Sequence, residues 1–197
     1  MVIRTYFNHK AAVWDEIATE NDEAKLRLMA ECLEIELGAT VLDVGTGTGV
    51  FIPFLLSKIG SNGQIVALDV AEEMLRKARA KGFNGNIDYL NADITNVPLP
   101  DETFDSVVCY SSFPHFQDKP KALSEINRVT KSGGNLLICH TSSRASINQF
   151  HHDIPEVEND FIPDGSEMQT MLAKAGFIDI TIEGNSENYL CQARKPK

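Results

Sequence analysis

The chain has 197 residues, a formal net charge of −10 and 43% hydrophobic residues, which suits one globular domain with a sizeable core. The acidic balance argues against an extended nucleic-acid surface, and no apolar run approaches the roughly 20 residues of a membrane span. The polar N-terminus is unlike a signal peptide, and four cysteines without a CxxC pair are typical of reduced thiols in a cytoplasmic protein.

Apolar periodicity and glycine stops predict alternating helices and strands. A helix over 22–37, ending at Gly38, comes first. It is followed by strand 40–44, helix 49–59, strand 63–70, helix 71–83 and strands 86–93 and 104–110. A helix over 119–134 with a glycine stop leads into strand 135–140. After an irregular stretch come a helix over 165–177, capped by Ser166, and a hairpin of 178–184 and 188–195 around Asn185. This alternation predicts a mainly parallel sheet with helices on both faces.

A glycine-rich turn, VGTGTG, connects strand 40–44 to helix 49–59. Ligands of open α/β sheets bind at the carboxyl ends of the strands, and the next strand ends at Asp69, which can accept hydrogen bonds from both hydroxyls of a ribose. The spacing Gly45-x-Gly47-x-Gly49 differs from the GxGxxG of dinucleotide sites. Asp43 suits a cation better than a pyrophosphate. These features together favour S-adenosylmethionine, which carries a ribose and a cationic tail.

The motifs and their order resemble the class I S-adenosylmethionine-dependent methyltransferases, especially the small-molecule, type-11-like group. VLDVGTGTG resembles the first motif, VALDVAEEML the second and NADITNVPLPDETFDSVVCYSSFPHF the block that follows. INRVTKSGGNLLI resembles the helix–turn–strand 5 region, with Ser132 in place of the usual proline. The resemblance covers about residues 38–195. It implies a Rossmann-like three-layer α/β sandwich with a mainly parallel, seven-stranded sheet whose last strand is antiparallel.

The resemblance also implies the organisation of the chain and the cofactor site. A single methyltransferase domain over 1–197 would comprise an N-terminal lid and helix (1–37), a cofactor-binding half (38–140), an acceptor-side insertion (141–165) and a closing helix and hairpin (166–197). The residues expected to bind S-adenosylmethionine are Asp43, Gly45, Thr46, Gly47, Gly49, Asp69, Val70, Met74, Ala92, Asp93, Ile94 and Tyr110. Ordinary alternatives remain, such as Asp69 as a helix cap and Asp93 as a turn former.

The methyl acceptor cannot be deduced from the donor motifs. All five histidines fall on segments that can reach the carboxyl edge of the sheet, and we interpret His115 and His151 as candidate bases or hydrogen-bond partners for the acceptor. Coincidence is the alternative. Further acceptor-side candidates are Tyr6, Trp14, His140, Arg144 and Asn148. A metal site of His115, His151 and Asp153 is a third interpretation; because the adjacent His151 and His152 point in different directions, no metal is expected.

The sequence therefore predicts a cytoplasmic enzyme that transfers a methyl group from S-adenosylmethionine to a small-molecule acceptor, without nucleic acid or membrane as a partner. A non-catalytic S-adenosylmethionine-binding module, a nucleotide-dependent oxidoreductase and an RNA methyltransferase are the alternatives. Methyl transfer depends mainly on alignment and on exclusion of water, so the lack of a catalytic signature does not argue against an enzyme.

Overall fold

The computed structural model describes residues 2–18 and 21–197, so positions 1, 19 and 20 of the expected lid lie outside the described residues. Seven strands form one sheet in the order β3-β2-β1-β4-β5-β7-β6. β7 pairs antiparallel with β5 and β6, whereas the other pairs are parallel. The strands are β1 (Thr40–Val44), β2 (Gln64–Asp69), β3 (Ile87–Asn91), β4 (Phe104–Tyr110), β5 (Thr130–His140), β6 (Ile178–Gly184) and β7 (Tyr189–Arg194). The predicted sheet is confirmed.

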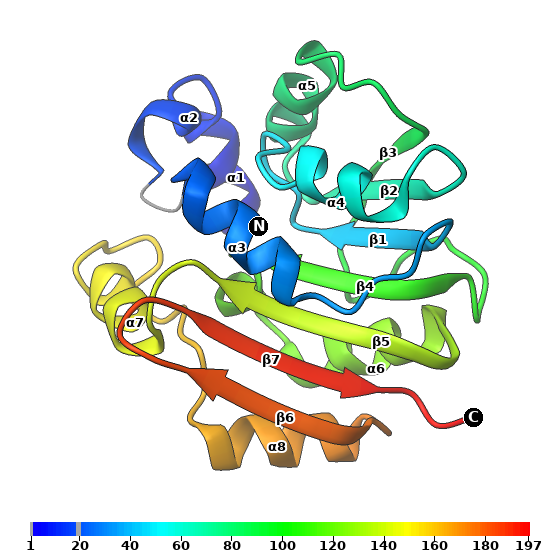
Figure 1. The fold of residues 1–197 in the computed structure, drawn as a ribbon. Helices are drawn as coiled ribbons and strands as arrows, with labels where there is room; N and C mark the ends of the chain where they lie inside the picture. Colours follow the sequence, from blue (N-terminus) through cyan, green and yellow to red (C-terminus); the bar gives the residue numbers. More distant parts are fainter. Residues whose placement is uncertain (1, 19–20) are drawn as a thin grey trace.

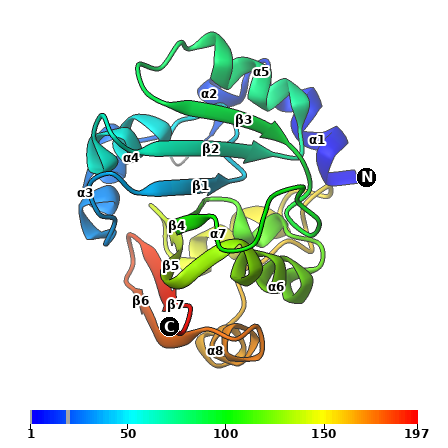
Figure 2. The ribbon, with the colours of Figure 1, turned by 90° about the vertical axis from the view of Figure 1, so that its right-hand side faces the viewer.

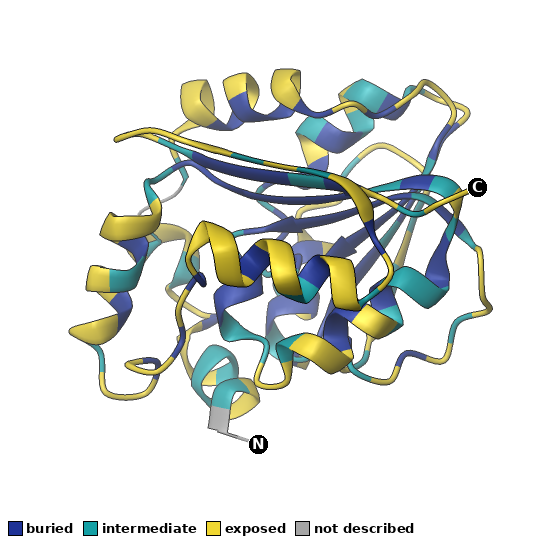
Figure 3. Ribbon diagram, turned by 90° about the horizontal axis from the view of Figure 1, so that it is seen from below, coloured by how far each residue is buried: buried dark blue, intermediate teal, exposed yellow. Residues whose placement is uncertain are grey.

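Helices cover both faces of this sheet, as predicted (Figures 1 and 2). α3 (Glu23–Cys32) and α4 (Ile52–Ile59) pack on one face, and α6 (Lys119–Val129) and α8 (Gly165–Lys174) pack on the other. α5 (Glu72–Ala80) contacts β2 and β3. Neighbouring strand residues such as Val41 and Leu42 point to opposite faces, so both must be apolar when both faces are covered. Figure 3 shows buried strands between helices whose outer surfaces are exposed.

Three further helices gather where the strands of the parallel part end. α1 (Val2–Lys10), α2 (Trp14–Ile17) and α7 (Arg144–His152) lie beyond the carboxyl ends of β1, β4 and β5 (Figure 1). The described N-terminal segment, residues 2–18, is tied to α5. Arg4 Nε lies 2.9 Å from Glu72 Oε2, and Lys77 Nζ donates to the carbonyl of Ala12 at 3.2 Å. Within the described residues, no helix combines the length and apolar character needed to cross a membrane.

The predicted end of the first long helix is wrong. α3 begins after Asp22, whose carboxylate accepts hydrogen bonds from the first turn, but it ends at Cys32 and not at Gly38. Leu33 follows in extended conformation and is only 1% exposed, whereas Leu37 is 82% exposed. The chain after α3 buries both Leu33 and Ile35, and this two-residue spacing is that of an extended chain and not of a helix.

Two other predicted features are also wrong. The helix expected over 119–134 ends at Val129, and Thr130 already belongs to β5; its buried hydroxyl donates to the carbonyl of Ile126 at 2.6 Å. α8 is capped by Asp164, whose carboxylate accepts from the backbone N–H of Glu167 at 2.8 Å, and not by Ser166. The irregular stretch after β5 contains α7, which the sequence analysis missed.

The guanidinium of Arg128 makes several of the contacts that fix the loop between β3 and β4 to α6. Arg128 Nη1 donates to the carbonyl of Leu99 at 2.8 Å and to Asp101 Oδ1 at 2.6 Å. Its Nη2 donates to the carbonyl of Val97 at 3.2 Å and to Glu125 Oε1 at 2.7 Å. The planar fork of an arginine is needed to reach acceptors in these different directions.

Replacing Arg128 by Lys is expected to lower the free energy of unfolding by about 1–2 kcal/mol, because one ammonium cannot satisfy the same set of acceptors. Urea denaturation measures the change. Arg76→Lys is the matched control, since Arg76 makes one exposed pair with Glu73 and should change stability by less than about 0.5 kcal/mol. Equal losses in the two variants would contradict a special role for Arg128.

Candidate functional site

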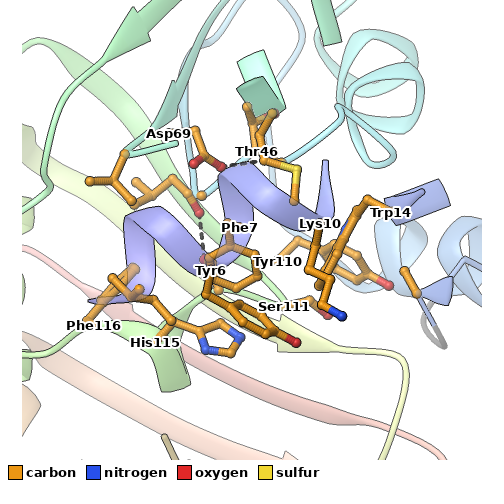
Figure 4. Close-up of a pocket in the computed structure, with 18 of the residues that line it drawn as sticks. Tyr6, Phe7, Lys10, Trp14, Thr46, Asp69, Tyr110, Ser111, His115 and Phe116 are labelled. Atoms are coloured by element: carbon orange, nitrogen blue, oxygen red, sulfur yellow. Dashed lines mark hydrogen bonds between the residues drawn. The ribbon is translucent and has the colours of Figure 1, made fainter. Parts of the chain in front are cut away.

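A cavity of about 740 Å³ lies at the carboxyl ends of the strands, where α1 crosses in front of the sheet (Figure 4). Its walls come from the glycine turn after β1, from the ends of β2 and β4, and from the N-terminal segment and α7. Both the donor-side and the acceptor-side candidates of the sequence analysis are represented in this one cavity.

The glycine turn presents bare backbone to the cavity. Gly45 and Gly47 have φ values of +71° and +56°, a conformation that residues with a Cβ rarely adopt. A Cβ on Gly45 would lie 2.4 Å from the Cβ of Ser112, so this glycine is needed for packing. A Cβ on Gly47 would have nothing nearer than Trp14 Nε1 at 4.0 Å. The space beside Gly47 is therefore open, and the indole of Trp14 borders it.

Asp69, at the end of β2, ties that strand to the glycine turn. Its Oδ2 accepts from the backbone N–H of Gly47, and its Oδ1 accepts from the N–H of Ala71, each at 2.8 Å. Each carboxylate oxygen has a second lone pair and can accept another hydrogen bond. Burial raises the pKa of Asp69 to about 6, although the backbone N–H groups favour the charged form. The side chain lines the cavity and can bind a pair of hydroxyls there.

Asp43 is placed beneath the turn, outside the cavity lining. It is 2% exposed, and its Oδ2 accepts from the hydroxyl of Thr46, which does line the cavity. Burial, with a smaller contribution from the charge of Asp69, raises the pKa of Asp43 to about 7. The structure therefore holds two buried carboxylates close to the turn, and a cation bound above them would favour their ionised forms.

The expected cofactor residues fall into those that line the cavity and those that lie behind its wall. The cavity is lined by Gly45, Thr46, Gly47, Asp69, Val70, Met74, Ala92, Asp93, Ile94 and Tyr110. Gly49 is not among the lining residues, and a Cβ there would meet the ring of Phe83 at 2.8 Å. Tyr110 stacks on Phe51 at 4.4 Å between ring centroids and shares a hydrogen bond with the hydroxyl of Thr141. Its ring orientation is thus determined by packing behind the cavity.

On the acceptor side, Asp160 brings two histidines together. His115 lies in η1 (Phe113–His115), and its Nδ1 is 2.8 Å from Asp160 Oδ2. His151 lies on α7, and its Nδ1 is 2.7 Å from the backbone carbonyl oxygen of Asp160. The two imidazole rings are 4.7 Å apart, and both line the cavity. Because the carbonyl accepts, His151 Nδ1 carries the proton and Nε2 keeps its lone pair.

The electrostatics of this cluster keep one imidazole neutral. Burial, together with the nearby His115, lowers the pKa of His151 to about 4. Asp160 is 7% exposed and also accepts from Gln117 Nε2 at 3.1 Å, so its carboxylate is held in place. A carboxylate that orients an imidazole is an arrangement suited to proton transfer. Phe7 packs edge-on against His115 at 4.9 Å, which limits access of water to that ring.

Tyr6 and Trp14 line the cavity, but the remaining acceptor-side candidates lie elsewhere. His140 is 1% exposed and packs 6.3 Å from the ring of Tyr189. Arg144 and Asn148 donate to the carbonyl of Ile162 at 3.4 and 3.0 Å, and so connect α7 to the following loop.

The three residues of the metal interpretation are not brought together. Asp153 accepts from Gln149 Nε2 at 3.1 Å, and Asp160 takes its place beside His115. Across residues 2–18 and 21–197, no group of three or more His, Cys, Asp or Glu side chains is placed to hold a metal ion.

Sequence reasoning missed several residues that line the cavity, among them Lys10, Phe116 and Phe150. A sequence signal existed for Lys10. It follows Ile3 and Tyr6 or Phe7 at helical spacing, so one face of α1 meets the cavity. Phe116 and Phe150 have no such signal, because their placement depends on contacts between distant segments.

Comparisons with known proteins agree with this geometry. Residues 42–138 match the methyltransferase domain family. The chain is 32% identical over 181 residues to the ubiquinone/menaquinone biosynthesis C-methyltransferase UbiE of Escherichia coli O1:K1, covering 78% of this chain and 72% of that protein. A SAM dependent methyltransferase from Aquifex aeolicus superposes with a TM-score of 0.73 at 28% identity, over 91% and 97% of the two chains. A SAM-dependent methyltransferase from Thermotoga maritima gives 0.79 at 19% identity, over 98% and 99%, which shows the shared fold.

The two raised pKa values predict how stability depends on pH. The ligand-free folded protein holds a proton on Asp43 between about pH 4 and pH 7, and one on Asp69 between about pH 4 and pH 6, that the unfolded chain has released. This contribution to stability is therefore lost as pH rises. Asp43→Asn should therefore lose less stability than the wild type between about pH 5 and pH 8. We expect a difference above about 1 kcal/mol in urea denaturation. Parallel pH profiles would contradict the assignment.

Proposed function

The chain belongs to the class I S-adenosylmethionine-dependent methyltransferases of the type 11 group, and from this premise we propose that it methylates a small-molecule acceptor held between α1, η1 and α7. The observation that carries the proposal is the single cavity that joins the glycine turn and Asp69 to the His115–Asp160–His151 cluster. Such a cavity can hold donor and acceptor side by side, as direct transfer requires.

The residues of the donor half fit S-adenosylmethionine. In the proposed arrangement Asp69 accepts from the ribose hydroxyls, and Val70, Ala92, Asp93 and Ile94 border the adenine. The open space beside Gly47 receives the methionine part. Thr46 lies between that part and Asp43, whose charge favours a cation. When bound, S-adenosylmethionine supplies a methyl group on a sulfonium that is already activated for displacement.

On the acceptor side we assign the general base to His115, with Asp160 as its positioning residue. Asp160 holds His115 Nδ1, so that Nε2 is the atom that takes a proton from the acceptor. The neutral His151 beside it accepts a hydrogen bond through Nε2, because its pKa of about 4 leaves it uncharged near neutral pH. A base is needed only when the nucleophile arrives protonated, so the cluster favours hydroxyl, thiol, amine or acidic carbon acceptors.

The apolar surroundings support an acceptor with a large apolar part. Phe7, Phe116, Ile147, Phe150 and Ile154 all line the cavity. UbiE, whose name describes a C-methyltransferase of ubiquinone and menaquinone biosynthesis, makes a ring-containing acceptor a reasonable first trial. The absence of a strongly basic cavity wall favours small molecules over RNA.

Donor binding tests the first half of the proposal. Asp69→Ala should weaken S-adenosylhomocysteine binding by about 2–4 kcal/mol, because charge-assisted hydrogen bonds to the ribose are lost. Isothermal titration calorimetry measures the affinity. Asp88→Ala, which removes an exposed carboxylate paired with Gln64, should leave it unchanged. A folded Asp69→Ala protein with wild-type affinity would show that the donor binds elsewhere.

Turnover tests the second half. A screen of thiols, amines, hydroxyls and carboxylates with methyl-labelled S-adenosylmethionine first identifies an acceptor. His115→Asn and Asp160→Asn should then lower kcat by about 100-fold or more with donor affinity unchanged, whereas the exposed His152→Asn should not. Normal turnover in His115→Asn would remove the base assignment. Donor binding without any product across the screen would favour a non-catalytic binding module.

A further inference from the structure

Lys10 contributes a positive charge to the cavity that no described carboxylate neutralises. Among the described lining residues it is the single lysine or arginine, and Asp69, Asp93, Asp118 and Glu156 provide the carboxylates. A cation is thus placed on α1, facing a described wall whose other formally charged side chains are carboxylates. The described residues give its ammonium only the ring of Tyr6, at 5.9 Å.

Neighbouring basic side chains are all engaged. Arg4 pairs with Glu72, and Lys81 pairs with Asp15 at 2.9 Å. Lys77 donates to the carbonyl of Ala12. These contacts attach the N-terminal segment to α5 and fix where α1 crosses the cavity. Lys10 takes no part in this attachment, so its ammonium is not needed to hold the segment on α5.

The position of Lys10 relates it to the open space beside Gly47. Trp14, which borders that space, follows Lys10 on the same segment, and both line the cavity. Tyr6 and Lys10 are one helical turn apart and extend from α1 in the same direction (Figure 4). The Tyr6 ring therefore keeps the ammonium of this exposed lysine within cation–π distance on the cavity side of α1.

The donor brings an anion that the cavity must accommodate. The methionine part of S-adenosylmethionine has an α-carboxylate besides its ammonium and sulfonium groups. The described carboxylates of the cavity repel this group, and a buried anion without a partner is unfavourable. A lysine ammonium is a suitable partner because it can direct any of its three donors toward a carboxylate.

We propose that Lys10 binds the α-carboxylate of the donor and thereby makes α1 part of the donor site; this inference rests on the proposed position of the donor. Lys10 lies before residues 42–138, the part that matches the family model, so this contact would belong to the N-terminal segment of this chain. Donor binding would then add a direct contact to α1, the helix that carries Tyr6 and Phe7 on the acceptor side.

Paired ligands test the proposal in the full-length protein. S-adenosylhomocysteine has the α-carboxylate, whereas 5′-methylthioadenosine keeps the nucleoside and the sulfur but lacks the amino acid. By calorimetry, Lys10→Met should raise the Kd of S-adenosylhomocysteine about 10- to 100-fold and leave that of 5′-methylthioadenosine unchanged. Lys10→Arg should restore most of the affinity. Lys121→Met, which removes an exposed lysine of α6, is the control and should bind both ligands normally.

Three outcomes would overturn the inference. Unchanged S-adenosylhomocysteine affinity in Lys10→Met, with a higher KM for the acceptor, would assign the ammonium to the acceptor. Equal weakening of both ligands would show that Lys10 acts by supporting the segment. An equal loss of S-adenosylhomocysteine affinity in Lys10→Met and Lys121→Met would show that the effect comes from the change in net charge. If the wild type binds neither ligand, the proposed function itself fails, which is distinct from a selective failure of Lys10.

Discussion

The geometry of the cavity depends on the carboxylate of Asp69. Its two oxygens accept from Gly47 and Ala71, so one side chain holds the turn after β1 against the start of α5. The parallel pairing of β1 with β2 brings these two segments to the same edge of the sheet. Without a common acceptor, the N–H of Gly47 would have to find another partner, and the open space beside it would lose its shape. The donor side therefore depends on a contact between consecutive βα units.

This arrangement has an electrostatic cost in the ligand-free protein. Asp43 and Asp69 are both nearly fully buried, and burial is the larger cause of both raised pKa values; the charge of Asp69 adds a smaller contribution to the raised pKa of Asp43. A cationic ligand reverses the balance, since it favours the ionised forms and releases the protons. In the proposed donor site, affinity for a sulfonium and lower stability of the ligand-free protein at neutral pH would be two consequences of the same buried carboxylates. An uncharged polar residue in place of Asp43 or Asp69 would raise the stability of the ligand-free protein, but it would also weaken binding of the cation.

Those parts of the molecule that depend on local signals could be predicted from sequence. The alternation of strands and helices, the glycine turn and the place of Asp69 follow from apolar runs, glycines and a carboxylate at a strand end. The antiparallel last strand is implied only by the family resemblance, and the strand order comes from the structure. The end of α3 could not be predicted, because helical spacing continues to Leu37 in the sequence, whereas the structure buries Leu33 and Ile35 in an extended segment. The association of His115 with Asp160 was equally hidden, because 45 positions separate them and α7 was not recognised. Long-range packing, which leaves no periodic pattern, decides such features.

In the proposed function, donor and acceptor would therefore be bound by structurally different parts of the chain. The donor side is formed by turns that leave adjacent strands, where backbone pairing fixes every position. The proposed acceptor side is formed by α1, η1 and the segment around α7, and the contacts between them that the structure describes involve side chains such as Phe7, His115 and His151. Side-chain contacts between loops and helices can be exchanged without disturbing the register of a sheet. Changes to the acceptor should thus be tolerated more readily than changes to the donor. A lysine that reaches from α1 to the donor would be the exception, because it makes one acceptor-side helix subject to the donor's constraints.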